Sequence, residues 1–261
     1  MPGTVLVTGA SSGIGRELAW LAAKDRHDVV LVARRRERLE LLAGELAVRF
    51  GIAAEFVAVD VSEPGAPARI VEIAEKRGPI EVLVNAAGLG VHGFFWKTPF
   101  TQERETILVN ALALTELTKL CVARMVSRRR GRILNLASTA AFQPGPLMAV
   151  YYASKAYVLS FTEALAEELS GTGVTATALC PGPTMTEFQE TAGLADVPLL
   201  RGPLVLDVAK VARAGWKGAK HGKRVVVPGL ANRILGLGAR VSPRRLSTRI
   251  ARKLQENRTP R

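Results

Sequence analysis

The chain is poor in the residues that build metal centres and disulfide frameworks. It has two cysteines, Cys121 and Cys180, and three histidines among 261 residues. Because the cysteines are far apart and lie in apolar stretches, we expect buried free thiols and no disulfide. Without a Cys/His cluster, the sequence predicts no metal site.

Long apolar runs are also missing. No stretch of about 18 apolar residues occurs, so the sequence predicts no membrane-spanning helix. Residues 1–3 lack the basic segment that opens a secretory signal peptide. These absences favour a protein of a reducing, cytoplasmic compartment.

Acidic residues are scarce only toward the C-terminus. The net charge is +13, yet residues 1–200 carry 20 Lys and Arg against 21 Asp and Glu. Residues 201–261 carry 16 against 2. The first 200 residues therefore give no electrostatic reason to expect nucleic-acid binding.

What the chain does have is a regular alternation of short apolar runs and amphipathic stretches. Strands are expected at residues 5–7, 28–32, 55–59, 80–84, 132–136, 174–179 and 224–227. Helices are expected at residues 14–24, 35–49, 66–76, 102–127, 151–169 and 207–220. This alternation predicts an α/β fold with a parallel sheet covered on both faces, which binds ligands at the carboxyl ends of its strands.

A glycine-rich turn, TGASSGIG, follows the first expected strand. It contains three glycines and two serines: Gly9, Ser11, Ser12, Gly13 and Gly15. The glycines permit a tight turn and close backbone approach, and the helix that follows would direct unpaired N–H groups at a pyrophosphate. The spacing departs from G-x-G-x-x-G, and a plain strand-to-helix turn is the alternative. We expect a dinucleotide site.

The end of the second strand carries the residues that select the dinucleotide. An acidic residue there would bind the ribose 2′-OH of NAD. This chain has Ala33 instead, followed by Arg34, Arg35 and Arg36. Because a guanidinium suits a 2′-phosphate, we expect NADP(H) to be preferred over NAD(H), with Arg34 as the main contact and Arg36 on a solvated helix face.

A tyrosine and a lysine stand four residues apart at Tyr151 and Lys155, thirteen residues after Ser138. This spacing places both on one helix face. A nearby cation favours the phenolate and lowers the tyrosine pKa from its usual value near 10. Such a pair can move a proton on and off a carbonyl oxygen. Tyr152 is expected to be a packing residue.

In order and spacing, these motifs resemble the short-chain dehydrogenase/reductase family over residues 4 to about 190. The matching pieces are TGASSGIG at 8–15, Asp60-Val61, NAAG at 85–88, Asn110, Ser138, YxxxK at 151–155, and Pro181-Gly182 with Thr184 and Thr186. The resemblance implies a Rossmann-type, doubly wound sandwich with a seven-stranded parallel sheet. It also implies a nicotinamide cofactor and a homodimer or homotetramer.

The resemblance assigns roles to four residues. Tyr151 would be the general acid in reduction, and Lys155 would hold the nicotinamide ribose and tune Tyr151. Ser138 would bond the substrate oxygen, and Asn110 would anchor a water in a proton relay. The expected cofactor contacts are Gly9, Ser11, Ser12, Gly13, Ile14, Gly15, Arg34, Asp60, Val61, Asn85, Ala86, Gly88, Tyr151, Lys155, Pro181, Gly182, Thr184 and Thr186.

Apolar residues border the expected nicotinamide position: Leu89, Phe94, Phe95, Trp96, Phe142, Leu147, Met148, Met185 and Phe188. They suit an apolar ketone or aldehyde, although core or oligomer packing would also explain them. His92 is expected at the surface, and residues 184–205 as a mobile lid. The expected activity is reversible NADPH-dependent carbonyl reduction. A 3-oxoacyl or steroid-type reductase and a non-catalytic NADPH-binding sensor or scaffold are alternatives.

The sequence divides into a catalytic Rossmann-type domain, residues 1–228, and a basic amphipathic extension, residues 229–261. In the extension Leu246, Ile250 and Leu254 recur every four residues among arginines. Such a helix can lie on an anionic membrane surface. It can equally pack on its own domain, cover the substrate site or join subunits, and the sequence leaves these alternatives open for residues 229–258.

Overall fold

Seven parallel strands form the centre of the fold, in the order β3-β2-β1-β4-β5-β6-β7. The computed structural model describes residues 3–194, 197–200 and 204–256. The strands are β1 (Thr4–Thr8), β2 (Val29–Ala33), β3 (Ala54–Ala58), β4 (Ile80–Asn85), β5 (Gly131–Leu136), β6 (Val174–Leu179) and β7 (Val225–Val226). The predicted seven-stranded parallel sheet is confirmed, since each observed strand begins and ends within one residue of its predicted bounds.

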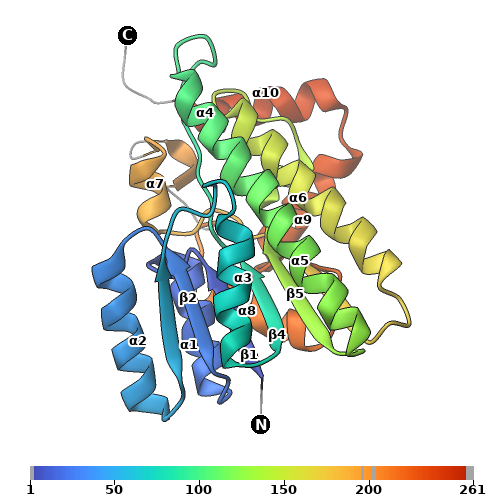
Figure 1. The fold of residues 1–261 in the computed structure, drawn as a ribbon. Coiled ribbons are helices and arrows are strands. Elements are labelled where there is room, and N and C mark those ends of the chain that lie inside the picture. The colour runs from blue at the N-terminus through green and yellow to red at the C-terminus, as the bar shows by residue number, and fades with distance from the viewer. Residues whose placement is uncertain (1–2, 195–196, 201–203, 257–261) are drawn as a thin grey trace.

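Helices cover both faces of this sheet (Figure 1). One face carries α1 (Gly13–Lys24), α2 (Arg36–Phe50) and α8 (Val208–Lys220). The other carries α3 (Ala66–Arg77), α4 (Phe100–Ile107), η1 (Leu108–Ala113), α5 (Leu114–Ser127) and α6 (Ala149–Glu168). The predicted doubly wound α/β sandwich is therefore confirmed, and two apolar cores lie between the sheet and its helical layers.

The sheet extends in both directions from β1, with β2 and β3 on one side and β4 to β7 on the other. The strand order therefore changes direction between β1 and β4. In such a sheet, the connections from adjacent strands leave toward opposite faces at the point of reversal, which opens a crevice at the carboxyl edge. The loops after β1, β4 and β5 border this point, so the chain topology brings the predicted motifs to one edge.

The longest helix runs without a break from Phe100 to Ser127 and changes to a π-helical turn in η1. By length and composition alone it could cross a membrane, with a mean hydropathy of 1.5 over its most apolar window. However, 44% of that window is buried, and the helix packs on the sheet beside α3 and α6. This packing is that of a core helix.

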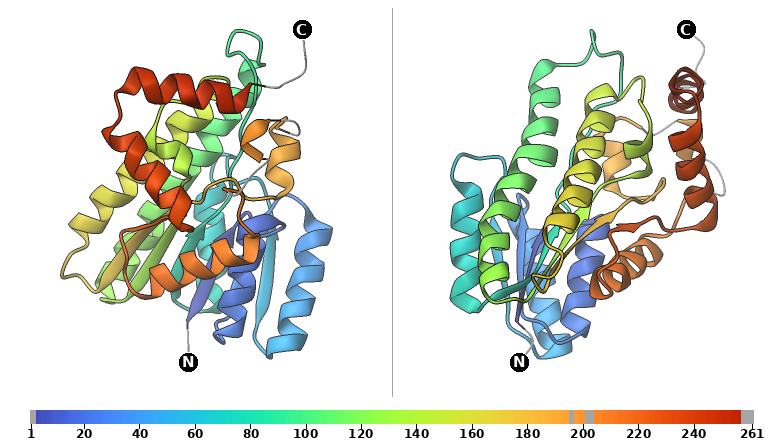
Figure 2. Two further views of the ribbon diagram at one scale, coloured as in Figure 1. Left: turned by 180° about the vertical axis from the view of Figure 1, so that it is seen from behind. Right: turned by 90° about the vertical axis from the view of Figure 1, so that its right-hand side faces the viewer.

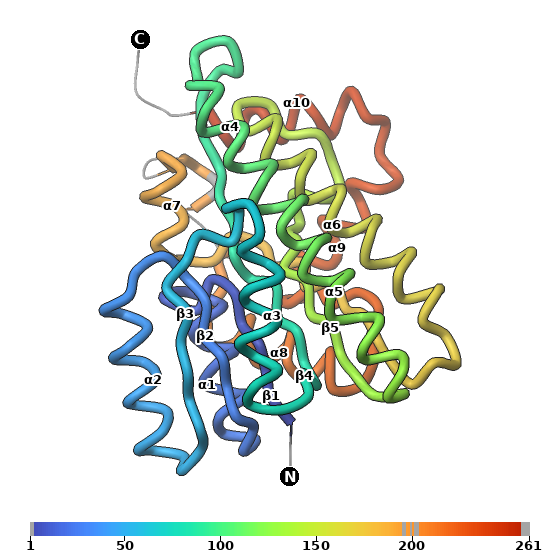
Figure 3. Tube along the Cα trace, in the orientation of Figure 1, coloured from blue at the N-terminus to red at the C-terminus, as the bar shows by residue number. Residues whose placement is uncertain are grey.

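The C-terminal segment continues from the sheet into α9 (Leu230–Val241) and α10 (Arg244–Gln255). Figure 3 follows it to the end of the molecule opposite the N-terminus. The division of the chain at residue 228 stays a prediction, and residues 257–261 of the extension lie outside the described residues. Short helices α7 (Glu187–Thr191), η2 (Thr139–Phe142) and η3 (Pro198–Leu200) complete the description.

Candidate active site

A cavity of about 390 Å³ opens at the carboxyl edge of the sheet. It brings together every predicted site residue except Asn85 and Asn110. The predicted residues that line it are Gly9, Ser11, Ser12, Gly13, Ile14, Gly15, Arg34, Asp60, Val61, Ala86, Gly88, Ser138, Tyr151, Lys155, Pro181, Gly182, Thr184 and Thr186.

The glycine turn forms one end of the cavity and leads directly into α1. Gly9 and Gly13 have φ of +66° and +54°, which strongly favours glycine. A Cβ on Gly9 would lie 2.7 Å from the Ala86 oxygen, and one on Gly15 would lie 2.3 Å from the Gly9 oxygen. The free N–H groups of the first turn of α1 and the two serine hydroxyls fit a pyrophosphate, so the turn fits a dinucleotide.

Two arginines follow β2 at the same end of the cavity. Arg34 Nη1 lies 3.6 Å from Asp60 Oδ2. Arg35 Nη2 donates to the hydroxyls of Ser11 and Ser12, both at 3.0 Å. The sequence pattern singles out Arg34, but Arg35 is the arginine that reaches the glycine turn. The sequence indicates a role for Arg35 only through its place in the run of three arginines.

Arg35 also holds the segment that follows β6. Its Nη1 lies 2.5 Å from Glu187 Oε2, and Arg38 bonds the other oxygen of this carboxylate. The hydrogen bonds from these two arginines lower the pKa of Glu187 below its usual value. Arg36 points elsewhere, with its guanidinium 5.5 Å from the centre of the Phe56 ring, and does not line the cavity.

Asn85, a predicted cofactor contact, is built into the sheet. Its Nδ2 donates to Asn135 Oδ1 at 2.9 Å and to Thr118 Oγ1 at 3.1 Å. Asn135 in turn donates to Thr162 Oγ1 at 2.9 Å. These buried bonds tie β4 and β5 to the helices above them. Residues 86–88 do line the cavity, so the loop after β4 reaches the site with its backbone.

Asn110 lies behind the cavity wall in the π-helical turn η1. Its Oδ1 accepts from Leu89 N at 2.8 Å, and its Nδ2 donates to Leu89 O and to Ser154 Oγ, both at 2.9 Å. Asn110 thus holds the loop after β4 against α6. A Cβ on Gly88 would lie 3.4 Å from both Asn110 Oδ1 and Lys155 Nζ. Gly88 therefore borders both side chains. The contact of Asn110 with a water stays a prediction.

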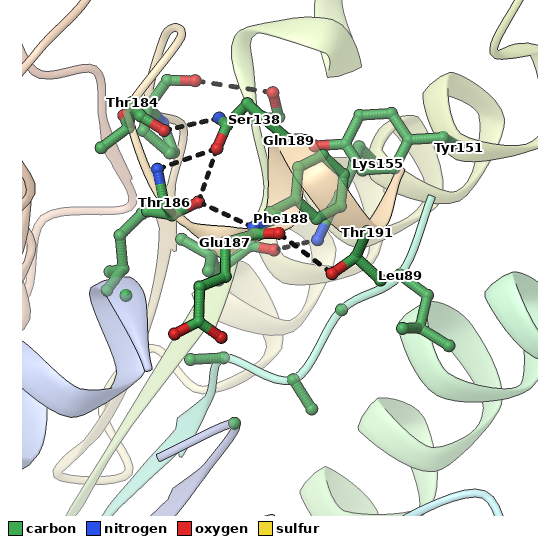
Figure 4. Close-up of a pocket in the computed structure, with 18 of the residues that line it drawn as sticks. Leu89, Ser138, Tyr151, Lys155, Thr184, Thr186, Glu187, Phe188, Gln189 and Thr191 are labelled. Atoms are coloured by element: carbon green, nitrogen blue, oxygen red, sulfur yellow. Dashed lines mark hydrogen bonds between the residues drawn. The ribbon is translucent and has the colours of Figure 1, made fainter. Parts of the chain in front are cut away.

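Ser138, Tyr151 and Lys155 line the middle of the cavity, between the glycine turn and the apolar end (Figure 4). Ser138 follows β5, and its Oγ accepts from Ala140 N at 3.1 Å. Tyr151 and Lys155 lie one turn apart on α6. Lys155 Nζ donates to Leu136 O at 2.8 Å and lies 5.8 Å from the centre of the Tyr151 ring.

Burial shifts the pKa values of this pair in opposite directions. It raises the pKa of Tyr151 to about 12, and a hydrogen bond with Ser138 opposes part of that rise. Burial lowers the pKa of Lys155 to about 8. The expected lowering of the Tyr151 pKa by Lys155 is not found, because burial raises this pKa and the group that opposes the rise is Ser138. At neutral pH Tyr151 is therefore a phenol with a proton to donate.

Beyond Tyr151 the cavity becomes apolar. The Phe188 and Tyr151 ring centres are 5.2 Å apart. Of the predicted apolar residues, Leu89, Met148 and Phe188 line the cavity. The others do not: Phe94, Phe95, Trp96, Phe142, Leu147 and Met185. Further apolar lining comes from Leu194 and Leu200; the predicted lid also includes residues 195–196 and 201–203, which lie outside the described residues.

Helix α10 forms the roof over this apolar end. Gln255 Nε2 donates to Tyr152 Oη at 2.7 Å, and the Gln255 carbonyl lies 2.8 Å from His92 Nε2. Ala251 and Leu254 line the cavity beside Gln255. Of the placements that the sequence leaves open for the extension, its α10 helix therefore takes the one that covers the cavity. Tyr152, predicted to be a packing residue, also lines the cavity. His92, predicted to lie at the surface, is half-buried. Both side chains contact α10 through Gln255, a role that the sequence did not predict for either.

The cysteines do not line the cavity. Cys121 and Cys180 are buried free thiols, as predicted, and burial raises the pKa of each to about 12. Among residues 3–194, 197–200 and 204–256, no group of three or more His, Cys, Asp or Glu side chains is placed to hold a metal ion.

Comparison with known proteins places this geometry in a family. The family profile described as short chain dehydrogenase matches residues 3–196. Ketoacyl reductase HetN of Nostoc sp. is 37% identical over 180 residues, which are 69% of this chain and 62% of that protein. The chain thus spans less than two thirds of this relative's length.

Two solved structures are similar over nearly the whole chain. A short-chain dehydrogenase from Sphingobium yanoikuyae in complex with NADPH has a TM-score of 0.82 and 35% identity, covering 92% of this chain and 94% of that one. The bulky-bulky ketone specific alcohol dehydrogenase from Comamonas testosteroni has a TM-score of 0.77 and 30% identity, covering 91% and 90%. The chain therefore belongs to the short-chain dehydrogenase/reductase family.

Proposed function

We propose that the protein is an NADPH-preferring reductase that converts an apolar ketone or aldehyde into its alcohol, in a reversible reaction. One observation carries this proposal. Ser138, Tyr151 and Lys155 lie where the polar compartment of the cavity, with its glycine turn and arginines, meets the apolar compartment beneath α10.

The polar compartment supplies the residues that would hold the cofactor. The turn at Gly9 to Gly15 would bind the pyrophosphate, and Arg34 and Arg35 would bind the ribose 2′-phosphate. The NADPH in the Sphingobium structure supports this preference. The remaining predicted contacts, from Asp60 to Thr186, line the same cavity, apart from Asn85. When bound, the cofactor supplies the hydride for the carbonyl carbon.

The proton comes from the protein. Tyr151 donates it to the carbonyl oxygen in reduction and accepts it in oxidation. The Ser138 hydroxyl hydrogen-bonds the same oxygen. Lys155 is charged below its pKa of about 8, and by the family resemblance it would hold the nicotinamide ribose and act on Tyr151 from there. Asn110 acts with them, by the family resemblance, as the anchor of a relay water.

The apolar compartment favours a hydrophobic substrate. The name of the Nostoc relative and the description of the Comamonas enzyme support a ketoacyl or bulky ketone substrate. A 3-oxoacyl or steroid-type reductase remains the alternative within this chemistry. A non-catalytic NADPH-binding sensor or scaffold is the alternative outside it, and the retention of Ser138, Tyr151 and Lys155 in one site disfavours it.

Several further proposals concern the protein as a whole. We infer a homodimer or homotetramer, supported by the exposed apolar residues Ile107, Leu112 and Tyr157 on neighbouring helices. We also propose a cytoplasmic location without a nucleic-acid partner, with residues 229–258 contacting a membrane from the aqueous side.

The test is NADPH oxidation by the purified protein over carbonyls of increasing chain length and ring size. Tyr151→Phe is the control, because it removes the proton donor and leaves the ring. Turnover by the wild type that falls at least 100-fold in the variant supports the reductase. Tight NADPH binding without turnover on any member would favour the sensor.

A further inference from the structure

Helix α9 carries its apolar side chains on the outside. Its buried positions are Asn232 and Gly236. The Asn232 amide donates to Leu204 O at 3.2 Å, and Gly236 lies against the Phe142 ring, which a Cβ would approach to 2.9 Å. The large apolar side chains are each more than half exposed: Leu230, Ile234, Leu235, Leu237 and Val241. A helix that packs with small and polar residues and exposes its aliphatic ones is inverted relative to an ordinary surface helix.

Helix α10 continues this surface and adds positive charge. Leu246 and Ile250 are 51% and 50% exposed, and neither lines the cavity. Arg244, Arg245 and Arg249 are exposed beside them. In the part of the chain that the structure describes, these three arginines form no ion pair, whereas Arg240 pairs with Glu163 and Arg252 with Glu256.

Figure 2 shows α9 and α10 as the outermost elements on one side of the molecule, at the right edge of its right panel. We call their exposed residues the α9–α10 surface. Contiguous exposed apolar patches on soluble proteins mark interaction sites. The partner of this one must accept aliphatic side chains and compensate a strongly positive charge.

We propose that the α9–α10 surface docks on the anionic surface of a lipid bilayer, with the aliphatic side chains of α9 in the headgroup boundary and the arginines of α10 at the lipid phosphates. Interfacial helices bind through buried apolar area and through attraction to anionic lipids, and this surface offers both. A second copy of the chain fits less well, because a two-fold interface would double the positive charge of this surface within one contact. Nucleic acid would leave the aliphatic stripe in water.

The position of α10 gives this docking a consequence for the enzyme, which rests on the proposed function. One side of α10 lies on the membrane-facing surface, and Ala251, Leu254 and Gln255 on the other side line the cavity. The bilayer would then lie against the roof of the site that receives an apolar carbonyl. The substrate class inferred from this arrangement is a carbonyl compound that partitions into membranes.

The test is flotation of the full-length protein with phosphatidylcholine vesicles, with and without about 30% phosphatidylserine. We expect binding to the anionic vesicles at low salt and its loss at 0.5 M NaCl, where charges are screened within roughly 4 Å. Failure to bind anionic vesicles at low salt would overturn the proposal. Vesicle binding needs no turnover, so this result is independent of the reductase test.

Two matched pairs of variants locate the contact. Arg244→Gln, Arg245→Gln and Arg249→Gln together should weaken binding on the order of a hundredfold, at roughly fivefold per cation. Arg69→Gln, Lys76→Gln and Lys119→Gln remove the same charge from α3 and α5 on the opposite face and should have much less effect. Equal losses in the two triple variants would show non-specific attraction and overturn the proposal.

The second pair tests the aliphatic stripe. Ile234→Ser with Leu237→Ser should reduce vesicle binding at least tenfold, whereas Leu41→Ser with Val48→Ser, at exposed positions on α2, should not. Light scattering measures the oligomeric state of each variant. If the α9 variant dissociates an oligomer and leaves vesicle binding unchanged, the surface is a subunit interface and the lipid proposal is wrong. All four variants should keep wild-type turnover of a water-soluble carbonyl.

Discussion

Glu187 and Arg35 form an ion pair of 2.5 Å that joins the helix after β6 to the loop after β2. Arg38 bonds the same carboxylate. The pair spans the polar end of the cavity, so the helix above the site is attached to an arginine that we propose to bind the 2′-phosphate. A phosphate at Arg35 would compete with Glu187 for the same guanidinium.

Removing this carboxylate should therefore favour NADPH. Glu187→Gln leaves Arg35 without an anionic partner, and we expect the Kd for NADPH to fall roughly two- to fivefold, the scale of an exposed ion pair. The Kd for NADH should not change. Fluorescence titration of both cofactors measures the effect, with Glu190→Gln on the same helix as control. A Kd for NADPH that rises in Glu187→Gln would contradict the competition.

The two arginines should contribute separately to cofactor choice. Arg35→Ala should weaken NADPH binding about tenfold to a hundredfold and NADH binding far less, because it removes charge-assisted bonds to the phosphate alone. Arg34→Ala should shift the NADPH-to-NADH affinity ratio in the same direction. Arg36→Ala, whose guanidinium lies over Phe56, is the control. An unchanged ratio in Arg34→Ala or Arg35→Ala removes that arginine from the role.

Lys155 should reduce stability at neutral pH. Burial lowers its pKa to about 8 in the folded chain, against 10.5 as the usual value. Between these values the unfolded chain binds more protons, so the free energy of unfolding contributed by this group rises with pH over that window. Lys155→Met should thus stabilise the fold at pH 7 by about 2 kcal/mol, after loss of the bond to Leu136, while turnover is lost.

Urea unfolding of Lys155→Met at pH 7 and at pH 10.5 measures this effect. The stability gain should shrink at the higher pH, where the wild-type lysine is neutral in the folded chain and about half charged in the unfolded chain. Lys119→Met, on the exposed side of α5, should show no comparable pH dependence. A variant less stable than the wild type at pH 7 would show that the buried ammonium has better compensation than its burial suggests.

The contact between Tyr152 and Gln255 should hold the roof of the cavity. Gln255→Leu leaves the buried Tyr152 hydroxyl without its partner, which should cost about 1–3 kcal/mol in the free energy of unfolding. Adding Tyr152→Phe should recover part of this loss, since the double variant leaves neither group unpaired. KM for the larger carbonyls should change in both variants. Strictly additive losses would mean that the two side chains do not interact.

Much of the catalytic geometry follows from local sequence. The apolar runs specify the strands, and parallel strands bring the ends of β1, β4 and β5 to one edge. The spacing of Tyr151 and Lys155 places both on one helix face, and the family resemblance groups them with Ser138. Asn85 was not predictable in this way. It is the last residue of β4, and its direction into the Asn135 network depends on the packing of α5 and α6.

The contacts of the C-terminal helix depend on the path of the whole chain. Gln255 meets Tyr152 across 103 residues, and no local pattern specifies such a meeting. The regular recurrence of Leu246, Ile250 and Leu254 also gives no sign that their environments differ. Leu254 lines the cavity, whereas the other two are exposed. Likewise, three consecutive arginines give no indication of which one turns toward Ser11 and Ser12.

The roof of the cavity comes from a part of the chain that the family profile does not reach, since the profile ends at residue 196 and α10 begins at Arg244. The proton donor and the roof therefore lie in different segments of the chain. A chimera that joins residues 1–228 to the C-terminal segment of a relative would exchange one wall of the substrate compartment while retaining Ser138, Tyr151 and Lys155. Substrate range in such enzymes can then diversify in the segment that carries α10 without disturbing the chemistry.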